Sequence, residues 1–310
     1  MQIRTDLALE AREMINEKKT GALKEVGKLP EGIIMETTDK PNVLVTRITV
    51  ENDEAAQAIN KKKGRYVTIE LKDGELNSID VYQEVAKTLC DELEAFMPSK
   101  NPSIMIAGLG NWNVTPDSLG PKVVEKLVVT RHIKDSMPKD SLDPRLGNVC
   151  AVAPGVLGIT GIETGELLQG VINRIKPDII FAIDALASRK TSRINTTIQI
   201  TDTGIVPGSG VGNKRMELSR DTLGIPVIAI GVPTVVEAIT LAKDLLENAS
   251  GEELEESLYT SISKTCGAEM VVTPKNIDIA IERMATTIAN GLNMTIHKGF
   301  DFGDINDYLM

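Results

Sequence analysis

The sequence predicts an α/β fold in which amphipathic helices cover both faces of a mostly parallel sheet. Short apolar runs rich in Ile, Val and Ala alternate with helical patterns between residues 103 and 248. Such alternation is typical of parallel strands joined by crossover helices. A chain of 310 residues with 42% hydrophobic composition is long enough to form one large domain of this kind.

A β-rich N-terminal extension precedes this core. Helical spacing covers residues 6–17, and β-branched side chains are concentrated at 43–50 and 66–69. Between residues 79 and 97, apolar side chains recur every four positions, which predicts an amphipathic helix. We assign residues 7–100 to this region and 101–310 to the main core of a single domain.

The elements of the main core follow in a regular order. Strands are predicted at 103–107, 148–153, 179–183, 194–201 and 226–230, and helices at 117–130, 163–175, 233–248 and 274–297. Pro274 marks the first turn of the last helix, a position where its missing N–H costs nothing. These elements together predict a three-layer sandwich.

Charge and hydropathy limit the binding partners and the cellular location that we expect for the protein. The formal net charge is −10, which argues against a nucleic-acid interface, since that needs a basic surface. The runs Lys18-Lys19 and Lys61-Lys62-Lys63 sit among acidic residues and are interpreted as solvated faces. No apolar run is long enough to span a bilayer, and no signal peptide is evident. We therefore expect a cytoplasmic protein.

Two carboxylates follow predicted strands, where open α/β sheets bind their ligands. Asp117 comes after strand 103–107 and a glycine-rich turn, and Asp184 closes strand 179–183. Two carboxyl groups in a poorly solvated cleft share one proton, so one can activate water while the other protonates a leaving amide. Two structural alternatives stay open, in which Asp117 caps the next helix and Asp184 accepts backbone N–H groups.

The glycine-rich segments and the two histidines give less specific indications of function. The glycine-rich stretch 202–213 either lines the cleft, with N–H donors for an oxyanion, or forms a plain tight loop. The turn at 108–111 lacks the further glycine and lysine of nucleotide loops. His132 and His297 are assigned to helix ends, where the dipole favours a positive imidazole. No HExxH motif or Cys spacing suggests a metal, and no cofactor is expected.

Several long motifs resemble the germination protease family. They are residues 108–122, 154–164, 182–187 and 207–215, with shorter matches at 4–8 and 62–66. The resemblance covers nearly the whole chain and implies a fold similar to the hydrogenase-maturation peptidases. It also implies an aspartic-type endopeptidase of the spore core that degrades small acid-soluble spore proteins during germination and is made as a tetrameric zymogen. The family's catalytic aspartates match Asp117 and Asp184.

The matched motifs also supply candidate residues for the substrate cleft. These are Gly108, Gly110, Asn111, Thr115, Glu163, Gly208, Ser209, Gly210, Asn213 and Lys214. Two other functions fit the same resemblance less well. One is a metal-dependent peptidase or maturation protease of the same fold, in which the two carboxylates bind a metal. The other is a protein that binds spore proteins without cutting them.

The resemblance further implies self-cleavage near the N-terminus. The family is cut at a site that resembles its substrates: Thr-Glu, an apolar residue, Ala and a downstream Glu. The stretch Thr5-Asp-Leu-Ala-Leu-Glu10 has this form. It predicts cleavage between Asp6 and Leu7, with residues 1–6 as the propeptide.

Overall fold

The computed structural model describes residues 5–11, 13, 31–72, 78–208, 215–250 and 270–309. Within these ranges the strands form one sheet in the order β1-β2-β3-β7-β8-β6-β4-β5, with β9 beside β8. The strands are β1 (Ile33–Asp39), β2 (Val43–Val50), β3 (Gly64–Leu71), β4 (Ser103–Gly108), β5 (Asn148–Val152), β6 (Ile179–Ser188), β7 (Thr197–Thr201), β8 (Val227–Glu237) and β9 (Val271–Val272).

The described helices are short on average, with two long exceptions, α3 and α11. They are α2 (Asp53–Ile59), α3 (Ile79–Glu94), α4 (Leu119–Glu125), α5 (Arg131–Ser136), α6 (Leu157–Thr160), α7 (Thr164–Ile175), α8 (Arg220–Leu223), α9 (Ala238–Ser250), α11 (Ile277–Ile296) and α12 (Phe302–Leu309). Three 3-10 turns are η1 (Thr115–Asp117), η2 (Lys139–Ser141) and η3 (Thr191–Arg193).

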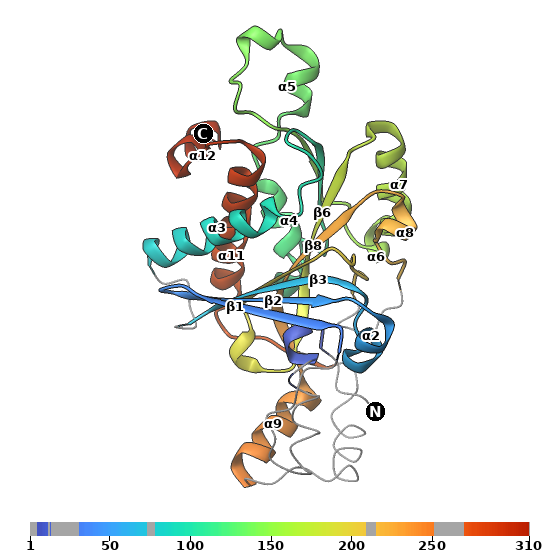
Figure 1. Ribbon diagram of the computed structural model, residues 1–310, viewed down its shortest axis with the longest axis vertical. Coiled ribbons are helices and arrows are strands. Elements are labelled where there is room, and N and C mark those ends of the chain that lie inside the picture. The colour runs from blue at the N-terminus through green and yellow to red at the C-terminus, as the bar shows by residue number, and fades with distance from the viewer. Residues whose placement is uncertain are drawn as a thin grey trace.

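The helices lie on both faces of the sheet, which confirms the predicted α/β fold. Helices α3, α4 and α11 lie on one side and α7 and α8 on the other (Figure 1). A large apolar core joins α3, α4 and α11 to the sheet, and a smaller one lies under α7 and α8. On this second face a third cluster packs α2 and residues 8–9 against β1, β2 and β3. The chain therefore has three layers around one sheet.

The sheet is mixed, and its parallel part is narrower than the sequence predicts. Strands β8, β6, β4 and β5 are parallel to one another, while the remaining pairs, including β7 with β8, are antiparallel. The connection from β6 to β7, residues 189–196, is too short for a crossover helix, so the chain must return antiparallel. The N-terminal hairpin strands then extend the sheet beyond β7.

Two predicted elements differ because of tertiary contacts. The helix expected at 117–130 ends at Glu125, where Asn293 of α11 accepts from the Val128 N–H and donates to the Lys126 carbonyl (3.0 and 3.1 Å). The helix expected from residue 233 begins only at Ala238, because β8 continues to Glu237 beside β6. Strand β1 and helix α2 have no counterpart in the prediction, since β1 buries only Ile33 and α2 is short.

His297 differs from the prediction of a positive imidazole at a helix end. It follows α11 and is fully buried, with Nδ1 accepting from the Gly147 N–H and Nε2 next to the Val128 carbonyl (3.0 and 2.9 Å). Burial lowers the pKa of His297 to about 4, so the ring is neutral at pH 7. His297 is nevertheless the C-cap of α11, as the predicted position at a helix end requires, whereas His132 lies in the first turn of α5, at the end where the helix dipole does not favour a positive charge.

The lysine run at 61–63 divides between the surface and the interior. Lys62 and Lys63 are exposed and pair with Glu217 and Asp53, as expected of a solvated face. Lys61 is half-buried, and for this residue the prediction is wrong, because its ammonium contacts backbone carbonyls of the N-terminal segment. Lys18 and Lys19 lie outside the described residues.

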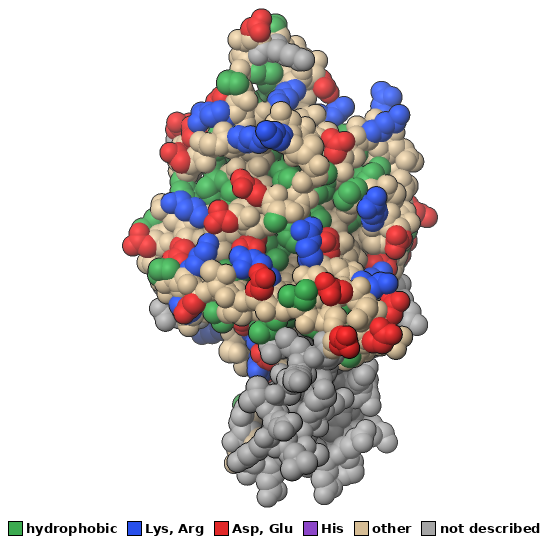
Figure 2. Space-filling model, viewed as in Figure 1, with side chains coloured by type: hydrophobic (Ala, Val, Ile, Leu, Met, Phe, Trp, Pro, Cys, Tyr) green, Lys and Arg blue, Asp and Glu red, His purple; other side chains and the backbone are tan. Residues whose placement is uncertain are grey.

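The surface and the helices carry two further observations. Acidic and basic side chains are interspersed over the face shown in Figure 2. None of the helices in the described ranges combines the length and apolar character needed to cross a membrane.

Candidate active site

Asp184 lies inside strand β6, not at its end as the sequence suggests. β6 continues to Ser188 and pairs with β8 along this stretch, whereas β4 ends at Gly108, opposite Ile183. Asp184 is therefore the first residue of β6 beyond the end of its neighbour β4. A strand edge left open in this way is the kind of position where an α/β sheet binds ligands. The side chain is 4% exposed.

Asp117 reaches the same place through the turn that follows β4. The Asn111 N–H donates to the Asp117 carboxylate (2.8 Å), and Gly110 has a positive φ of 111° that a side chain would disfavour. A Cβ on Gly110 would lie 2.0 Å from the Asp117 carbonyl oxygen. Gly120 of α4 likewise packs directly on the backbone of Leu109. The glycines therefore allow the close approach that fixes Asp117 at the end of β4.

The capping alternative for Asp117 is wrong. The N-cap of α4 is Ser118, and the Asp117 carboxylate binds the Asn111 N–H of the preceding turn instead. The alternative for Asp184 is correct in part, because its carboxylate accepts from the Ala185 N–H (2.9 Å) and the Gly208 N–H. These bonds orient the carboxyl group without neutralising it.

Both aspartates line one cavity of about 330 Å³. Its walls come from the turn after β4, the second half of β6, the end of β8, the segment between β5 and α6, the start of α7, residues 207, 208 and 215, and β9. They are Leu109, Gly110, Asn111, Val114, Pro116, Asp117, Gly155, Val156, Thr164, Asp184, Ala185, Leu186, Ala187, Pro207, Gly208, Arg215, Thr234, Val235 and Val271. Most of these side chains are apolar, so few groups compete with the two carboxylates for a polar ligand.

The negative charge of Asp117 acts on the carboxyl group of Asp184. Burial raises the pKa of Asp184 well above its ordinary value, and the negative charge of Asp117 raises it further. Burial also raises the pKa of Asp117, while the Asn111 N–H and the nearby Arg215 guanidinium act in the opposite direction. Asp184 is thus the member of the pair that holds a proton more firmly. Raised carboxyl pKa values in a cavity are typical of acid/base sites.

The cavity contains only some of the predicted cleft residues. Gly110, Asn111 and Gly208 line it. Gly108 does not, because its Cα faces Gly120 of α4, and Thr115 and Glu163 are each next to a lining residue rather than part of the wall. Ser209, Gly210, Asn213 and Lys214 lie outside the described residues.

Arg215 and the apolar residues of β6 and β8 were not identified from the sequence. Arg215 stands at the end of the motif 207–215, directly after Lys214, and the sequence has no feature that places its charge near Asp117. Leu186, Ala187 and Thr234 could not be identified as lining residues, because the predicted strand stopped at residue 183 and a helix was expected from 233.

Within the described parts of the chain, no group of three or more His, Cys, Asp or Glu side chains is placed to hold a metal ion.

The N-terminal segment is bound along β6 beyond Asp184. The Asp6 N–H donates to the Ala187 carbonyl (3.2 Å), and the Ala187 N–H donates to the Asp6 carboxylate (2.9 Å). Leu7 and Ala8 are fully buried, and the Asp6 carboxylate is close enough to Asp184 to add to the rise of its pKa. The predicted cleavage bond therefore lies beside the cavity that holds the aspartates.

A model of the family described as germination protease matches residues 8–257 and 248–309 of this chain. A germination protease of Clostridium acetobutylicum is 44% identical over 331 residues, covering 99% of each chain. One from Bacillus cereus is 38% identical over 361 residues, covering 99% of this chain and 96% of the relative.

Among solved structures, the chain is similar to the [NiFe] hydrogenase maturation protease HycI of Thermococcus kodakarensis. The TM-score is 0.35 and the identity 20%, over 65% of this chain and 98% of the other. A likeness of this degree carries no information about chemistry. The matches over nearly the full length decide the family. This chain belongs to the germination protease family and is a protease with a role in spore germination.

Proposed function

We propose that the chain is an aspartic-type endopeptidase in which Asp117 and Asp184 activate water. The observation that carries this proposal is the shared cavity, which two carboxyl groups from separate segments line and in which burial and the charge of Asp117 raise the pKa of Asp184. Such a pair retains one proton over a pH range in which isolated carboxyl groups are fully ionised. One member can then act as a base and the other as an acid in the same step.

The environments assign different roles to the two aspartates. Asp117 is half-buried and faces Arg215, so it is the ionised member and accepts a proton from water. Asp184 is more deeply buried and keeps the shared proton. The hydroxide adds to the peptide carbonyl carbon, and the proton of Asp184 goes to the leaving nitrogen as the C–N bond breaks. The proton taken by Asp117 restores the pair after proton exchange.

The substrates we propose are the small acid-soluble spore proteins, cut during germination in the spore core. The support is the family together with the sequence Thr5–Glu10, which has the form of the family's cleavage site and lies beside the cavity. We also propose that the chain is made as a zymogen that removes residues 1–6 by cutting between Asp6 and Leu7, and that it assembles as a homotetramer.

Incubation of the purified chain with a small acid-soluble spore protein tests the enzymatic proposal. Fragments identified by mass spectrometry are expected with the unchanged chain and not with Asp117→Asn or Asp184→Asn. Asp178→Asn is the matched control, because Asp178 is exposed at the opposite end of β6, where it binds the Ser103 N–H. Fragments from both cavity variants at the unchanged rate would remove the pair from the mechanism. Binding without fragments from the unchanged chain would favour a non-catalytic binder.

A further inference from the structure

The peptide bond between Asp6 and Leu7 has two side-chain donors on its carbonyl oxygen. Lys61 Nζ lies 2.9 Å and Gln199 Nε2 lies 3.0 Å from the Asp6 carbonyl oxygen. The same two side chains hold the neighbouring groups, with Lys61 at the Thr5 carbonyl (3.2 Å) and Gln199 Oε1 at the Ala8 N–H (2.6 Å). The segment is thus fixed on both sides of the bond.

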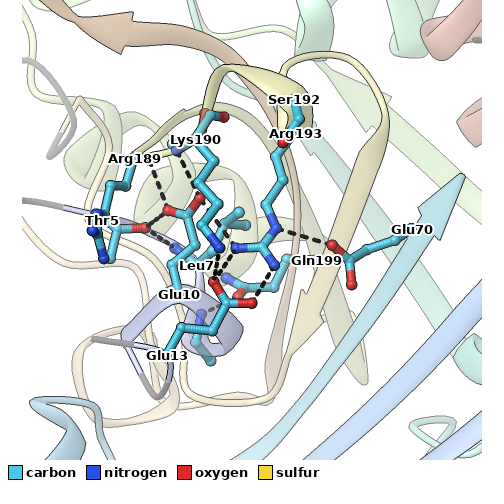
Figure 3. A network of polar contacts seen from close by, with 12 residues as sticks. Thr5, Leu7, Glu10, Glu13, Glu70, Arg189, Lys190, Ser192, Arg193 and Gln199 are labelled. Carbon is cyan, nitrogen blue, oxygen red and sulfur yellow. Dashed lines mark hydrogen bonds and ion pairs between the residues drawn. The ribbon is translucent and has the colours of Figure 1, made fainter. Parts of the chain in front are cut away.

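Local structure explains why these two residues are in place. Asn60 ends helix α2 in the left-handed conformation (φ 51°), which is an ordinary helix end for Asn, and directs the next residue toward the N-terminal segment. Gln199 lies in the middle of β7 and is buried on the face of the sheet opposite to Ile198 and Ile200, which belong to the large apolar core. Figure 3 shows Gln199 beside Leu7 beneath the Glu10 network. Gln199 thus belongs to a central strand of the sheet, and Lys61 directly follows the end of α2.

Asp184 projects from the same face of the sheet as Gln199. Gly231 of β8 is paired with Asp184 on one side and with Gln199 on the other, and residues directly opposite one another share a face. Neighbouring strands are about 4.8 Å apart, so the two backbones are separated by about 10 Å. Between them Gly231 has no side chain, and the side chain of Leu186 lies over it. The Asp6–Leu7 bond lies on this face at Ala187, three residues along β6 from Asp184, and the Asp6 charge adds to the rise of the Asp184 pKa.

The neutral Asp6 carbonyl oxygen does not require a charged hydrogen-bond donor. One neutral donor suffices for an amide carbonyl, whereas a positively charged donor gains most when the oxygen becomes negative. Lys61 is half-buried and placed at backbone carbonyls, while its neighbours Lys62 and Lys63 pair with carboxylates at the surface. Burial lowers the pKa of the Lys61 ammonium, and the negative charges of Asp6 and Glu10 act in the opposite direction. This placement is suited to the charge that develops on a carbonyl oxygen when water attacks.

We propose that Lys61 and Gln199 form the oxyanion-binding site for hydrolysis of the Asp6–Leu7 bond. The inference rests on the proposed self-cleavage. Water adds its oxygen to the Asp6 carbonyl carbon and loses a proton to Asp117. The carbonyl oxygen becomes negative and is held by the Lys61 ammonium and the Gln199 amide. The C–N bond then breaks, Leu7 nitrogen takes the proton of Asp184, and Asp6 is left with a new carboxylic acid. This acid loses its proton to the Leu7 amine, and the proton on Asp117 returns to Asp184.

The test follows the appearance of the Leu7 N-terminus by intact-mass spectrometry, using freshly purified full-length chain. Lys61→Met removes the cation, and Gln199→Glu removes the donor while keeping an acceptor for the Ala8 N–H. Each is expected to slow cleavage by about 10²- to 10³-fold, the usual effect of losing one oxyanion donor. Lys61→Arg, which keeps a cationic donor, is expected to restore most of the rate. Lys62→Met is the matched control and is expected to be unchanged.

The outcomes separate this inference from the proposed function. If Lys61→Met and Gln199→Glu cut at the unchanged rate while Asp117→Asn and Asp184→Asn do not cut, the oxyanion site is wrong and the aspartate pair stands. If both aspartate variants also cut at the unchanged rate, the proposed mechanism fails. Absence of cleavage in the unchanged chain would overturn both. Loss of cleavage in Lys61→Met without recovery in Lys61→Arg, at equal thermal stability, would also contradict the oxyanion role.

Discussion

Two buried carboxylates on the same face of the sheet, Asp184 and Glu10, are held in opposite ways. Glu10 is fully buried and accepts from the backbone N–H groups of Arg189 and Lys190 (2.7 and 3.0 Å) and from the Thr5 hydroxyl. It also pairs with Arg193 (3.3 Å), as Figure 3 shows within a larger network. Asp184 has backbone donors too, but the nearest charges are those of Asp117 and Asp6, which are negative.

The difference separates an anchoring carboxylate from a reactive one. Arg193, 7% exposed, joins Glu10 to Glu13 (2.6 Å) and Glu70 (2.9 Å), and these carboxylates raise the pKa of its guanidinium. A buried carboxylate with this many hydrogen-bond and ion-pair partners holds the N-terminal segment in place. A buried carboxyl group facing like charges keeps a proton that it can donate. A buried carboxyl group therefore anchors the N-terminal segment at Glu10 and is suited to proton transfer at Asp184.

The largest expected effect distinguishes the two carboxylates by activity. Asp184→Asn should lower the rate of spore-protein cleavage by at least about 10²- to 10⁴-fold, the contribution typical of one acid/base group. Glu10→Gln, the same chemical change at the anchoring site, should leave that rate within a few-fold. Fragment yield against time measures both. Equal loss of activity in the two variants would contradict the division of roles.

Stability should show the reverse order. Glu10→Ala leaves Arg193 and two buried backbone N–H groups without this acceptor, and we expect a loss of about 3 to 5 kcal/mol in the free energy of unfolding. Glu10→Gln keeps the shape and one acceptor oxygen and should lose less. Urea unfolding followed by circular dichroism measures the difference. A neutral result for Glu10→Ala would show that the network does not hold the segment.

Asp184→Asn is expected to increase stability at pH values above the raised pKa of Asp184. Because the pKa of Asp184 is raised, its contribution is fully present below the ordinary carboxyl value of 3.8 and is lost as the pH rises through the raised pKa. Above that raised pKa the unchanged chain carries a buried charge that the Asn variant lacks. The gain should shrink as the pH falls toward 4. Urea unfolding at several pH values tests this, and a gain that grows toward acid pH would contradict it.

The smallest effect is expected from Asp6→Asn. The Asp6 charge is one of the lesser causes that raise the pKa of Asp184, after burial and Asp117. Its removal should move the alkaline limb of the self-cleavage rate to slightly lower pH, by a fraction of a pH unit. Rates of Leu7 appearance between pH 4 and 8 measure the shift. A move toward higher pH would show that Asp6 does not act on the pair through its charge.

Local pattern was sufficient for much of the fold. The four-residue spacing of α3 and the apolar runs of β4, β5 and β7 placed these elements close to their observed bounds. In each of these elements the apolar side chains face one core and therefore recur at a fixed spacing. That spacing can be found in the sequence alone. The lengths of the strands were harder to predict. β6 and β8 continue past their apolar starts because each lies beside the other, and no local pattern records a neighbour.

The sequence by itself determined the alternation of strands and helices, the residue types available for chemistry, and the resemblance that named Asp117 and Asp184. Tertiary structure alone decided that β6 outruns β4 at Asp184, and that Arg215 faces Asp117. It also decided that Lys61, one of three consecutive lysines, turns inward to a carbonyl 55 residues away in the chain. Side-chain periodicity is a property of neighbouring residues, whereas burial, charge pairing and carbonyl contacts arise only when distant segments meet.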